Sequence, residues 1–438
     1  MTISSTFRQL TKPLIQPFSE FFRLEAASGI VLLLSSLLAL VLANTSVGIA
    51  RYFPQIWDSV LAVSVGGIQL TKSLSHWVND GLMVLFFLIV GLEIKREILE
   101  GELASVKQAT LPLVAALGGM LLPAALFWVI NRNASTANGW GIPMATDIAF
   151  ALAIVTLLGD RVPLALKVFL TALAIVDDLG AVLVIAFFYT PVIDSRYLLS
   201  AGGLWLLLLL LNRLGVRALG LYLVLGVVLW YLTLKSGVHA TLAGVLLAIA
   251  VPFRTRLTDS DTVQAQLGVM QQRIQDKTVV PRDLSEELEE LTEQISSPAQ
   301  RLEHRLHEAV AFLIIPLFAF CNTSLLIDLS LLGQLTDPLA VGIMVGLLLG
   351  KPIGIVLLSY VAVRLGWASL PTGVSWRQLI GVGTLAGIGF TMSIFVTLLA
   401  FEGQPILQNE AKIAILVSSL LAGVLGYALL RKSAPQTV

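Results

Sequence analysis

Long runs of apolar residues, separated by short charged or Pro/Gly-rich stretches, dominate the chain. Most runs approach the length of roughly 20 residues that an α-helix needs to cross a bilayer. The pattern predicts an all-α polytopic membrane protein with twelve transmembrane helices. The predicted spans are residues 25–43, 76–98, 108–130, 136–158, 163–189, 197–212, 216–234, 238–252, 306–326, 338–360, 378–401 and 411–430.

The composition agrees with this pattern. The 438 residues are 56% hydrophobic and 13% charged, and a formal net charge of zero gives no reason to expect a nucleic-acid partner. The single cysteine, Cys321, excludes an intrachain disulfide. The first run, residues 25–43, is about as long as a full span and follows a charged, polar leader, so we interpret it as a retained anchor. Residues 1–438 are therefore expected to form one transmembrane domain.

The positive residues predict the orientation. If the loops alternate between the two sides, most Lys and Arg residues lie at the two termini and in every even-to-odd loop. Cytoplasmic loops carry an excess of such residues, which places both termini in the cytoplasm. The opposite side holds only Arg51, Lys72, Arg132, Arg196, Lys235 and Lys412.

Residues 60–72, between the first two spans, alternate in part between apolar and polar side chains on either side of Gly66-Gly67. Both glycines can take positive φ, so the pattern predicts a small periplasmic β-hairpin. Unpaired strand edges invite a second copy of the chain. We interpret the hairpin as the dimerisation element of a homodimer, with a plain loop as the alternative.

Residues 258–300 form a polar insert in a cytoplasmic loop. Apolar residues recur there at helical spacing in two stretches separated by Pro281, and Asp283 with Glu286 resembles a capping box. The insert is predicted to form two amphipathic helices. Its role, regulatory or not, is open.

Two adjacent carboxylates, Asp177 and Asp178, lie in the middle of the fifth apolar run. A charge at bilayer depth costs several kcal/mol and by default marks an ion, proton or substrate path. The two negative charges repel each other, so the pair should hold a proton or a cation near neutral pH. Adjacent helix residues point about 100° apart, so the two carboxylates need different partners. A carboxylate pair within a helix-packing network is the alternative.

Spans four and eleven contain residues that do not suit an unbroken helix. Residues 139–150 combine two glycines, a proline and Asp147, and residues 381–393 are rich in glycine, including Gly387 and Gly389. The two spans enter the membrane from opposite faces, and each is the middle of a trio. This pattern predicts an inverted repeat with two broken helices, which points to a secondary transporter with its site at mid-membrane. Glycines that only allow close helix packing are the alternative.

The intramembrane charges fit such breaks. A broken helix exposes an N-terminal end with about half a positive charge and a C-terminal end with about half a negative charge. Asp147 can neutralise the former and Lys351, in span ten, the latter. Lys351 is the one basic residue deep in a predicted span, so it is also the expected ion-pair partner of Asp177.

Several further motifs occur in order along the chain. They are Asn79-Asp80-Gly81-Leu82, residues 91–97 (GLEIKRE), Ala145-Thr146-Asp147-Ile148-Ala149, Val176-Asp177-Asp178, residues 234–244 (LKSGVHATLAG), Arg301-Leu302-Glu303-His304, Gly350-Lys351 and residues 387–393 (GIGFTMS). Together they resemble the NhaA family of sodium/proton antiporters across nearly the whole chain. The resemblance implies twelve helices, with spans four and eleven broken and crossing at mid-membrane, and a dimer joined partly by a periplasmic hairpin. It also implies a bacterial inner-membrane location, and pH-regulated, electrogenic exchange of cytoplasmic Na+ or Li+ for more than one external proton.

Carried over by position, the resemblance makes Asp177 and Asp178 the cation and proton site, with Thr146 as a nearby oxygen donor. It makes Asp147 and Lys351 the residues that compensate the helix dipoles. Six further residues match positions that the family associates with pH regulation: Glu93, Arg96, Glu97, His239, Glu303 and His304. Taken alone, a charged cluster at a span end is also typical of a solvated helix end, and a single histidine of packing. The insert before Arg301 departs from the family pattern and leaves the pH profile open.

Hard oxygen ligands suit Na+ and Li+, and no Cys/His cluster suggests a transition metal, so no cofactor is expected. A cation channel or a cation-coupled symporter is the alternative function, although the broken-helix repeat argues against a channel. An intramembrane aspartyl enzyme is disfavoured. Its carboxylates must face each other across a water, and neighbours on one helix cannot do so.

Overall fold

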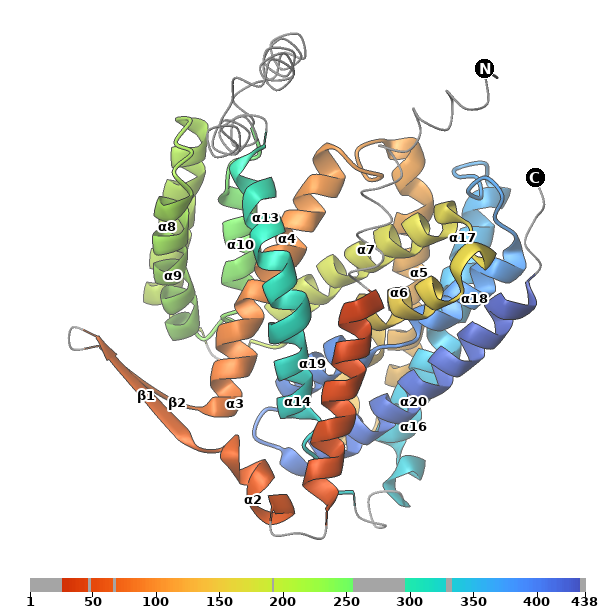
Figure 1. The fold of residues 1–438 in the computed structure, drawn as a ribbon, viewed down its shortest axis with the longest axis horizontal. Helices are drawn as coiled ribbons and strands as arrows, with labels where there is room; N and C mark the ends of the chain where they lie inside the picture. The colour runs from red at the N-terminus through yellow and green to blue at the C-terminus, as the bar shows by residue number, and fades with distance from the viewer. Residues whose placement is uncertain are drawn as a thin grey trace, which may run out of the picture. The chain divides into compact units, whose positions relative to one another are not determined.

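The computed structural model describes residues 26–45, 49–65, 68–190, 193–254, 296–327 and 333–433. Over these residues the protein is mostly helical with one two-stranded sheet (Figure 1). The chain divides into two compact units, which we describe separately. The first comprises Met1–Met83, Glu97–Thr190 and Val310–Val438, and the second comprises Val84–Arg96 and Pro191–Ala309.

The first unit holds the sheet and most of the helices. Its elements are the helix Ala26–Asn44, α2 (Ile49–Ile56), β1 (Val60–Val65), β2 (Ile68–Ser73), α3 (Leu74–His76), η1 (Trp77–Leu82), α5 (Val106–Asn131), η2 (Ser135–Met144), α6 (Ile148–Leu157), η3 (Gly159–Arg161), α7 (Leu164–Phe188), η4 (Val310–Ile314), α14 (Ile315–Asn322), η5 (Gln334–Thr336), α16 (Pro338–Val345), η6 (Gly346–Gly350), α17 (Lys351–Arg364), α18 (Trp376–Ala386), α19 (Phe390–Ala400) and α20 (Pro405–Lys432). The second unit holds most of α4 (Met83–Leu99), together with α8 (Ser195–Arg213), α9 (Leu219–Ser236), α10 (Leu242–Ala250) and α13 (Pro298–Ala309).

Within the described residues, eight helices are long and apolar enough to cross a membrane, and the number rises to ten if each of two bent pairs is one span. Every predicted span range contains helix. However, α4 has 17 residues and α10 only nine, which at about 1.5 Å per residue is short of a bilayer. The membrane class is confirmed, and the number twelve stays a prediction.

The small sheet lies where the alternating pattern predicts it. Strands β1 and β2 pair antiparallel, from Val60 opposite Ser73 to Val65 opposite Ile68. Gly66-Gly67 lies outside the described residues. A plain loop is therefore excluded, and the role of the hairpin in dimerisation stays a prediction.

Small residues bring the helix that carries Lys351 close to its neighbour α5. A Cβ atom added at Gly118 of α5 would collide with the carbonyl oxygen of Gly354 in α17, and the reverse also holds. Such contacts let two helix backbones approach each other directly. The π-helical segment η6 ends immediately before Lys351, and such segments are frequent at functional sites.

The second unit is built around a cluster of buried apolar residues from α4, α8, α9, α10 and α13. Helices α8 and α9 run side by side (Figure 1), and Tyr222 of α9 is completely buried. The insert predicted at residues 258–300 lies almost entirely outside the described residues, and its last residues, 298–300, begin α13.

Candidate functional site

The first break in the chain separates η2 from α6. Backbone dihedral angles leave the helical region at Ala145 (φ −78°, ψ 150°) and Asp147 (φ −91°, ψ 99°), and the two helices bend by 40°. Asp147 is the N-cap of α6, because its Oδ1 atom accepts a hydrogen bond from the backbone N–H of Phe150 at 3.1 Å. An aspartate at this position satisfies an otherwise unpaired donor and the positive end of the helix dipole.

The second break separates α18 from α19 at residues 387–389, where the two helices bend by 44°. Gly387 and Gly389 have negative φ values of −68° and −93°, so neither glycine is needed for a left-handed backbone. Gly387 is needed for space, because a Cβ atom there would collide with the carbonyl oxygen of Leu347 in η6. Gly387 therefore lies at the break and also allows close packing, which was the alternative explanation for these glycines.

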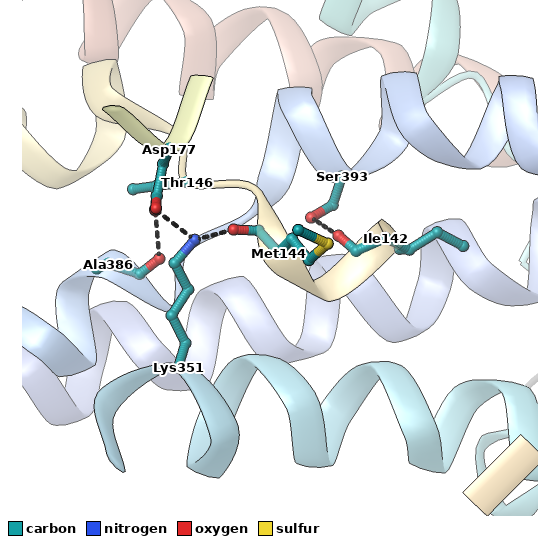
Figure 2. Close-up of polar contacts among 7 residues, drawn as sticks. All are labelled: Ile142, Met144, Thr146, Asp177, Lys351, Ala386 and Ser393. Atoms are coloured by element: carbon teal, nitrogen blue, oxygen red, sulfur yellow. Dashed lines mark hydrogen bonds and ion pairs between the residues drawn. The ribbon is translucent and has the colours of Figure 1, made fainter. Parts of the chain in front are cut away.

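The two breaks are hydrogen-bonded to each other. The N–H of Asp147 donates to the carbonyl oxygen of Ile388 at 2.6 Å. Asp147 Oδ2 accepts from both the N–H and the Oγ1 of Thr391, at 3.0 and 2.6 Å. Beyond the breaks, Ser393 Oγ donates to the carbonyl oxygen of Ile142 at 2.7 Å (Figure 2). Asp147 thus lies at the N-terminal ends of both α6 and α19.

Lys351 lies at the other end of the first break, where η2 ends. Its Nζ atom is 2.8 Å from Asp177 Oδ2, and both side chains are completely buried. The same ammonium group donates to the carbonyl oxygen of Met144, the last residue of η2 (Figure 2). Lys351 therefore contacts a buried carboxylate and the negative end of a helix at the same time.

Thr146 joins this pair from the extended segment. Its Oγ1 lies 2.8 Å from Asp177 Oδ2 and 3.0 Å from the carbonyl oxygen of Ala386, at the end of α18. A hydroxyl group has one proton, so it can donate to only one of these two acceptors at a time. When it donates to Ala386, its lone pairs are available to a cation beside Asp177.

Asp177 and Asp178 lie in the middle of α7 and are 1% and 2% exposed. Asp177 Oδ1 has no hydrogen-bond partner among the described residues. An acceptor buried in this way is costly unless a proton or cation satisfies it. Together, the carboxylates of Asp177 and Asp178 and the hydroxyl of Thr146 supply hard oxygen ligands, of the kind that suits Na+ or Li+. No group of three His, Cys, Asp or Glu side chains suited to a metal ion occurs in the part of the chain that the structure describes.

The residues predicted to act in pH regulation lie mainly in the second unit. Arg96 of α4 and Glu303 of α13 form an ion pair there through Nη1 and Oε1, with the Glu303 side chain 9% exposed and the Arg96 side chain 33% exposed. His239 lies between α9 and α10. Of the other candidates, Glu93 and Glu97 are on α4 and His304 is on α13. Glu97 falls at the start of a segment of the first unit.

Sequence reasoning missed three of the polar partners. Thr391 binds Asp147, and the carbonyl groups of Met144 and Ala386 face Lys351 and Thr146. Thr391 gave one usable signal, as a hydroxyl residue two positions after Gly389 in a glycine-rich span. The carbonyl groups gave none, because every residue has one.

Comparison with known proteins finds extensive similarity. The sequence profile of the family described as Na+/H+ antiporter 1 matches residues 19–430. The chain is 50% identical to the Na+/H+ antiporter NhaA of Oleidesulfovibrio alaskensis over 426 residues, which cover 95% of this chain and 94% of that protein. It is 47% identical to the Na+/H+ antiporter NhaA 2 of Syntrophotalea carbinolica, covering 95% of this chain and 97% of that protein. It is 45% identical to the Na+/H+ antiporter NhaA of Pseudomonas fluorescens, covering 95% of this chain and 96% of that protein.

Proposed function

The chain belongs to the Na+/H+ antiporter 1 family and exchanges Na+ for protons, and we propose that Asp177 and Asp178 are the carboxylates that carry both ions. The observation that carries this proposal is the buried contact of Asp177 with Lys351 and Thr146. A buried carboxylate without a partner is too costly to remain ionised, so Asp177 must always bind a cationic group or a proton. A transported cation or proton can therefore replace Lys351 at Asp177.

Competition at Asp177 links the two ions. In the described arrangement the ammonium group of Lys351 lies 2.8 Å from Asp177 Oδ2. A sodium ion that binds this carboxylate and Asp178 must displace either that ammonium group or the proton that has taken its place on Asp177, together with the proton of Asp178. Because the same oxygen atoms serve either ion, proton and cation cannot occupy the site together, and coupling between the two ions needs no separate gate.

The proton count follows from the number of carboxylates. If a proton first replaces Lys351 at Asp177, and Asp177 and Asp178 both release a proton when one Na+ or Li+ binds, more than one proton moves for each cation and net charge crosses the membrane. The exchange is then electrogenic and takes up external protons in return for cytoplasmic Na+, as Na+ and pH homeostasis requires. Two adjacent buried carboxylates support this count; a single carboxylate would not.

We assign the two breaks a mechanical role as well. Asp147, bound to the N-terminal ends of α6 and α19, and Lys351, bound to the last carbonyl group of η2, compensate the helix dipoles. The pairs η2–α6 and α18–α19 act as two broken spans of a twelve-span inverted repeat that crosses near mid-membrane. Rocking about this crossing exposes the site to one side of the membrane at a time.

The remaining features complete the proposed assembly. The exposed apolar side chains of the hairpin, including Val60, Leu61 and Val63, support pairing with a second copy of the chain in a homodimer. The excess of Lys and Arg on one side supports an inner-membrane orientation with both termini in the cytoplasm. The ion pair between Arg96 and Glu303 supports a role of the end of α4 in pH regulation.

Everted membrane vesicles with a pH-sensitive dye test the assignment of the carboxylates. Asp177→Asn and Asp178→Asn should each abolish Na+-driven proton movement, because an amide cannot exchange a proton for a cation. Asp194→Asn, at the exposed N-cap of α8, is the matched control and should leave exchange unchanged. Full exchange in Asp178→Asn would end the proposal.

A further inference from the structure

Lys95, near the end of α4, binds the end of α10. Its Nζ atom donates to the carbonyl oxygens of Ala248 at 3.2 Å, Ile249 at 2.7 Å and Val251. The last four carbonyl groups of a helix have no partner within the helix. The fourth such group here, that of Ala250, accepts from Nδ2 of Asn212 in α8 at 2.9 Å. Side chains from α4 and α8 thus satisfy every terminal carbonyl group of α10.

We propose that Lys95 is a positioning residue that joins α4 to α10 only while its side chain is protonated, and that its charge therefore contributes to the pH dependence of exchange. The reason is the number of donors. An ammonium group has three N–H donors and no acceptor, which matches three carbonyl oxygens. A neutral amine has two N–H donors and a lone pair, so one carbonyl group would face a lone pair and the favourable charge at the end of α10 would be lost.

The carbonyl groups at the end of α10 are the groups that stabilise the charge of Lys95. Helix α10 has no titratable side chain. The neighbouring elements carry these titratable and charged groups: Glu93, Arg96 and Glu97 on α4, Arg196, Tyr197 and Arg213 on α8, Arg254 after α10, and Arg301, Glu303, His304, Arg305, His307 and Glu308 on α13. Within the described ranges no carboxylate lies within ion-pair distance of Lys95 Nζ, and Glu303 is bound to Arg96 instead. Lys95 can therefore leave its contacts by losing its own proton, without a competing cation.

The end of α4 also reaches the next helix of the unit. The N–H of Ala299, in the first turn of α13, donates to the carbonyl oxygen of Pro252 at 3.1 Å, and Arg96 pairs with Glu303 one turn further on. Two successive residues of α4 thus hold the end of α10 and the start of α13. Loss of the Lys95 proton would release the first of these two attachments and leave the second.

Cysteine labelling tests the attachment without any transport measurement. Val251 is completely buried, so Val251→Cys in a Cys321→Ala background reports opening at the end of α10. Near neutral pH, Lys95→Met should raise the rate of maleimide labelling about tenfold, as expected for the loss of charged hydrogen bonds. Lys95→Arg, which keeps the charge, should leave the rate within about twofold of the parent. In alkaline buffer the parent, which keeps Lys95, should be labelled faster than Lys95→Arg. The ionisation of the thiol introduced at position 251 raises both labelling rates equally and therefore cancels in their ratio.

Exchange in everted vesicles tests the consequence, and this arm rests on the proposed function. Lys95→Arg should move the pH dependence of exchange to more alkaline values, and Lys95→Met should flatten it. Lys107→Met and Lys107→Arg, at an exposed lysine of α5, are the matched controls and should leave the profile unchanged. Equal labelling rates in all three Lys95 forms, or profiles that superimpose on the parent, would overturn the inference. A failure of Asp178→Asn to abolish exchange would leave the labelling result intact and count only against the proposed function.

Discussion

Two lysine contacts, one in each unit, differ in whether a carboxylate takes part. Lys351 and Lys95 both donate to carbonyl groups at helix C-terminal ends, those of Met144 and of the α10 terminus. Lys351 is completely buried and also pairs with Asp177 at 2.8 Å. Lys95 is partly exposed and has no carboxylate partner among the described residues.

The difference concerns what can displace each lysine. A carboxylate attracts cations and protons, so the partner of Lys351 can be taken away by either transported ion. Backbone carbonyl groups do not change charge, so Lys95 stays in place until it loses its own proton. A lysine at a helix end therefore competes directly with a transported ion only when a carboxylate is added to the contact. Lys95 would act on exchange only through the packing of α4 and α10.

The largest effect is expected from Lys351→Met. This change leaves the Asp177 carboxylate buried without its ion-pair partner, and the free energy of unfolding should fall by about 3 kcal/mol. Lys95→Met leaves only carbonyl groups unsatisfied and should lower it by about 1 to 2 kcal/mol. Thermal unfolding of the purified protein in detergent measures both values.

Lys351→Arg is the control for charge, because it keeps a cation beside Asp177 with a different shape. It should recover most of the stability that Lys351→Met loses. If Lys95→Met proved as destabilising as Lys351→Met, the distinction between the two lysine contacts would fail.

A smaller effect is expected from Asp147→Asn. Both carboxylate oxygens of Asp147 accept hydrogen bonds, from Phe150 on one side and from Thr391 on the other. An amide has one oxygen, so one of the two helix ends loses its acceptor, at a cost of about 2 kcal/mol. Exchange in everted vesicles should slow without disappearing, because Asp177 and Asp178 remain.

Asp194→Asn gives the comparison with an ordinary helix cap. Asp194 is exposed and caps α8 through a single oxygen, which binds the N–H of Arg196 at 2.9 Å. Asparagine is as good an N-cap as aspartate, so stability should hardly change. Equal losses in the two variants would show that Asp147 acts as a simple cap and does not link the two breaks.

The smallest effect is expected at the ion pair of Arg96 and Glu303. With a third of the Arg96 side chain exposed, water screens the pair, and the coupling energy should stay below about 1 kcal/mol. A double-mutant cycle with Arg96→Gln and Glu303→Gln, followed by thermal unfolding, measures it. A coupling as large as that between Lys351 and Asp177 would mean that charge pairing in the second unit is as important to stability as it is at the site.

Much of the architecture is a local property of the chain and could be predicted from it. Apolar runs of span length, Asp177 and Asp178 within one of them, and glycine or proline interruptions at matching places are visible in the residues themselves. Each follows from the cost of exposing polar groups to lipid, which applies wherever the segment ends up. The hairpin could also be predicted from the sequence, at residues 60–72, because side-chain alternation around two glycines is a short-range signal.

The partners of the charged side chains were harder to predict from the sequence. Lys351 could be matched to Asp177 because few charges occur in the spans. Nothing in the residues tied Asp147 to Thr391 or Lys95 to the end of α10. Lys95 binds only backbone C=O groups, and Asp147 binds a backbone N–H together with the hydroxyl of Thr391. Almost every residue carries backbone N–H and C=O groups and many spans carry hydroxyls, so only the packing of the helices selects which of them a charged side chain meets.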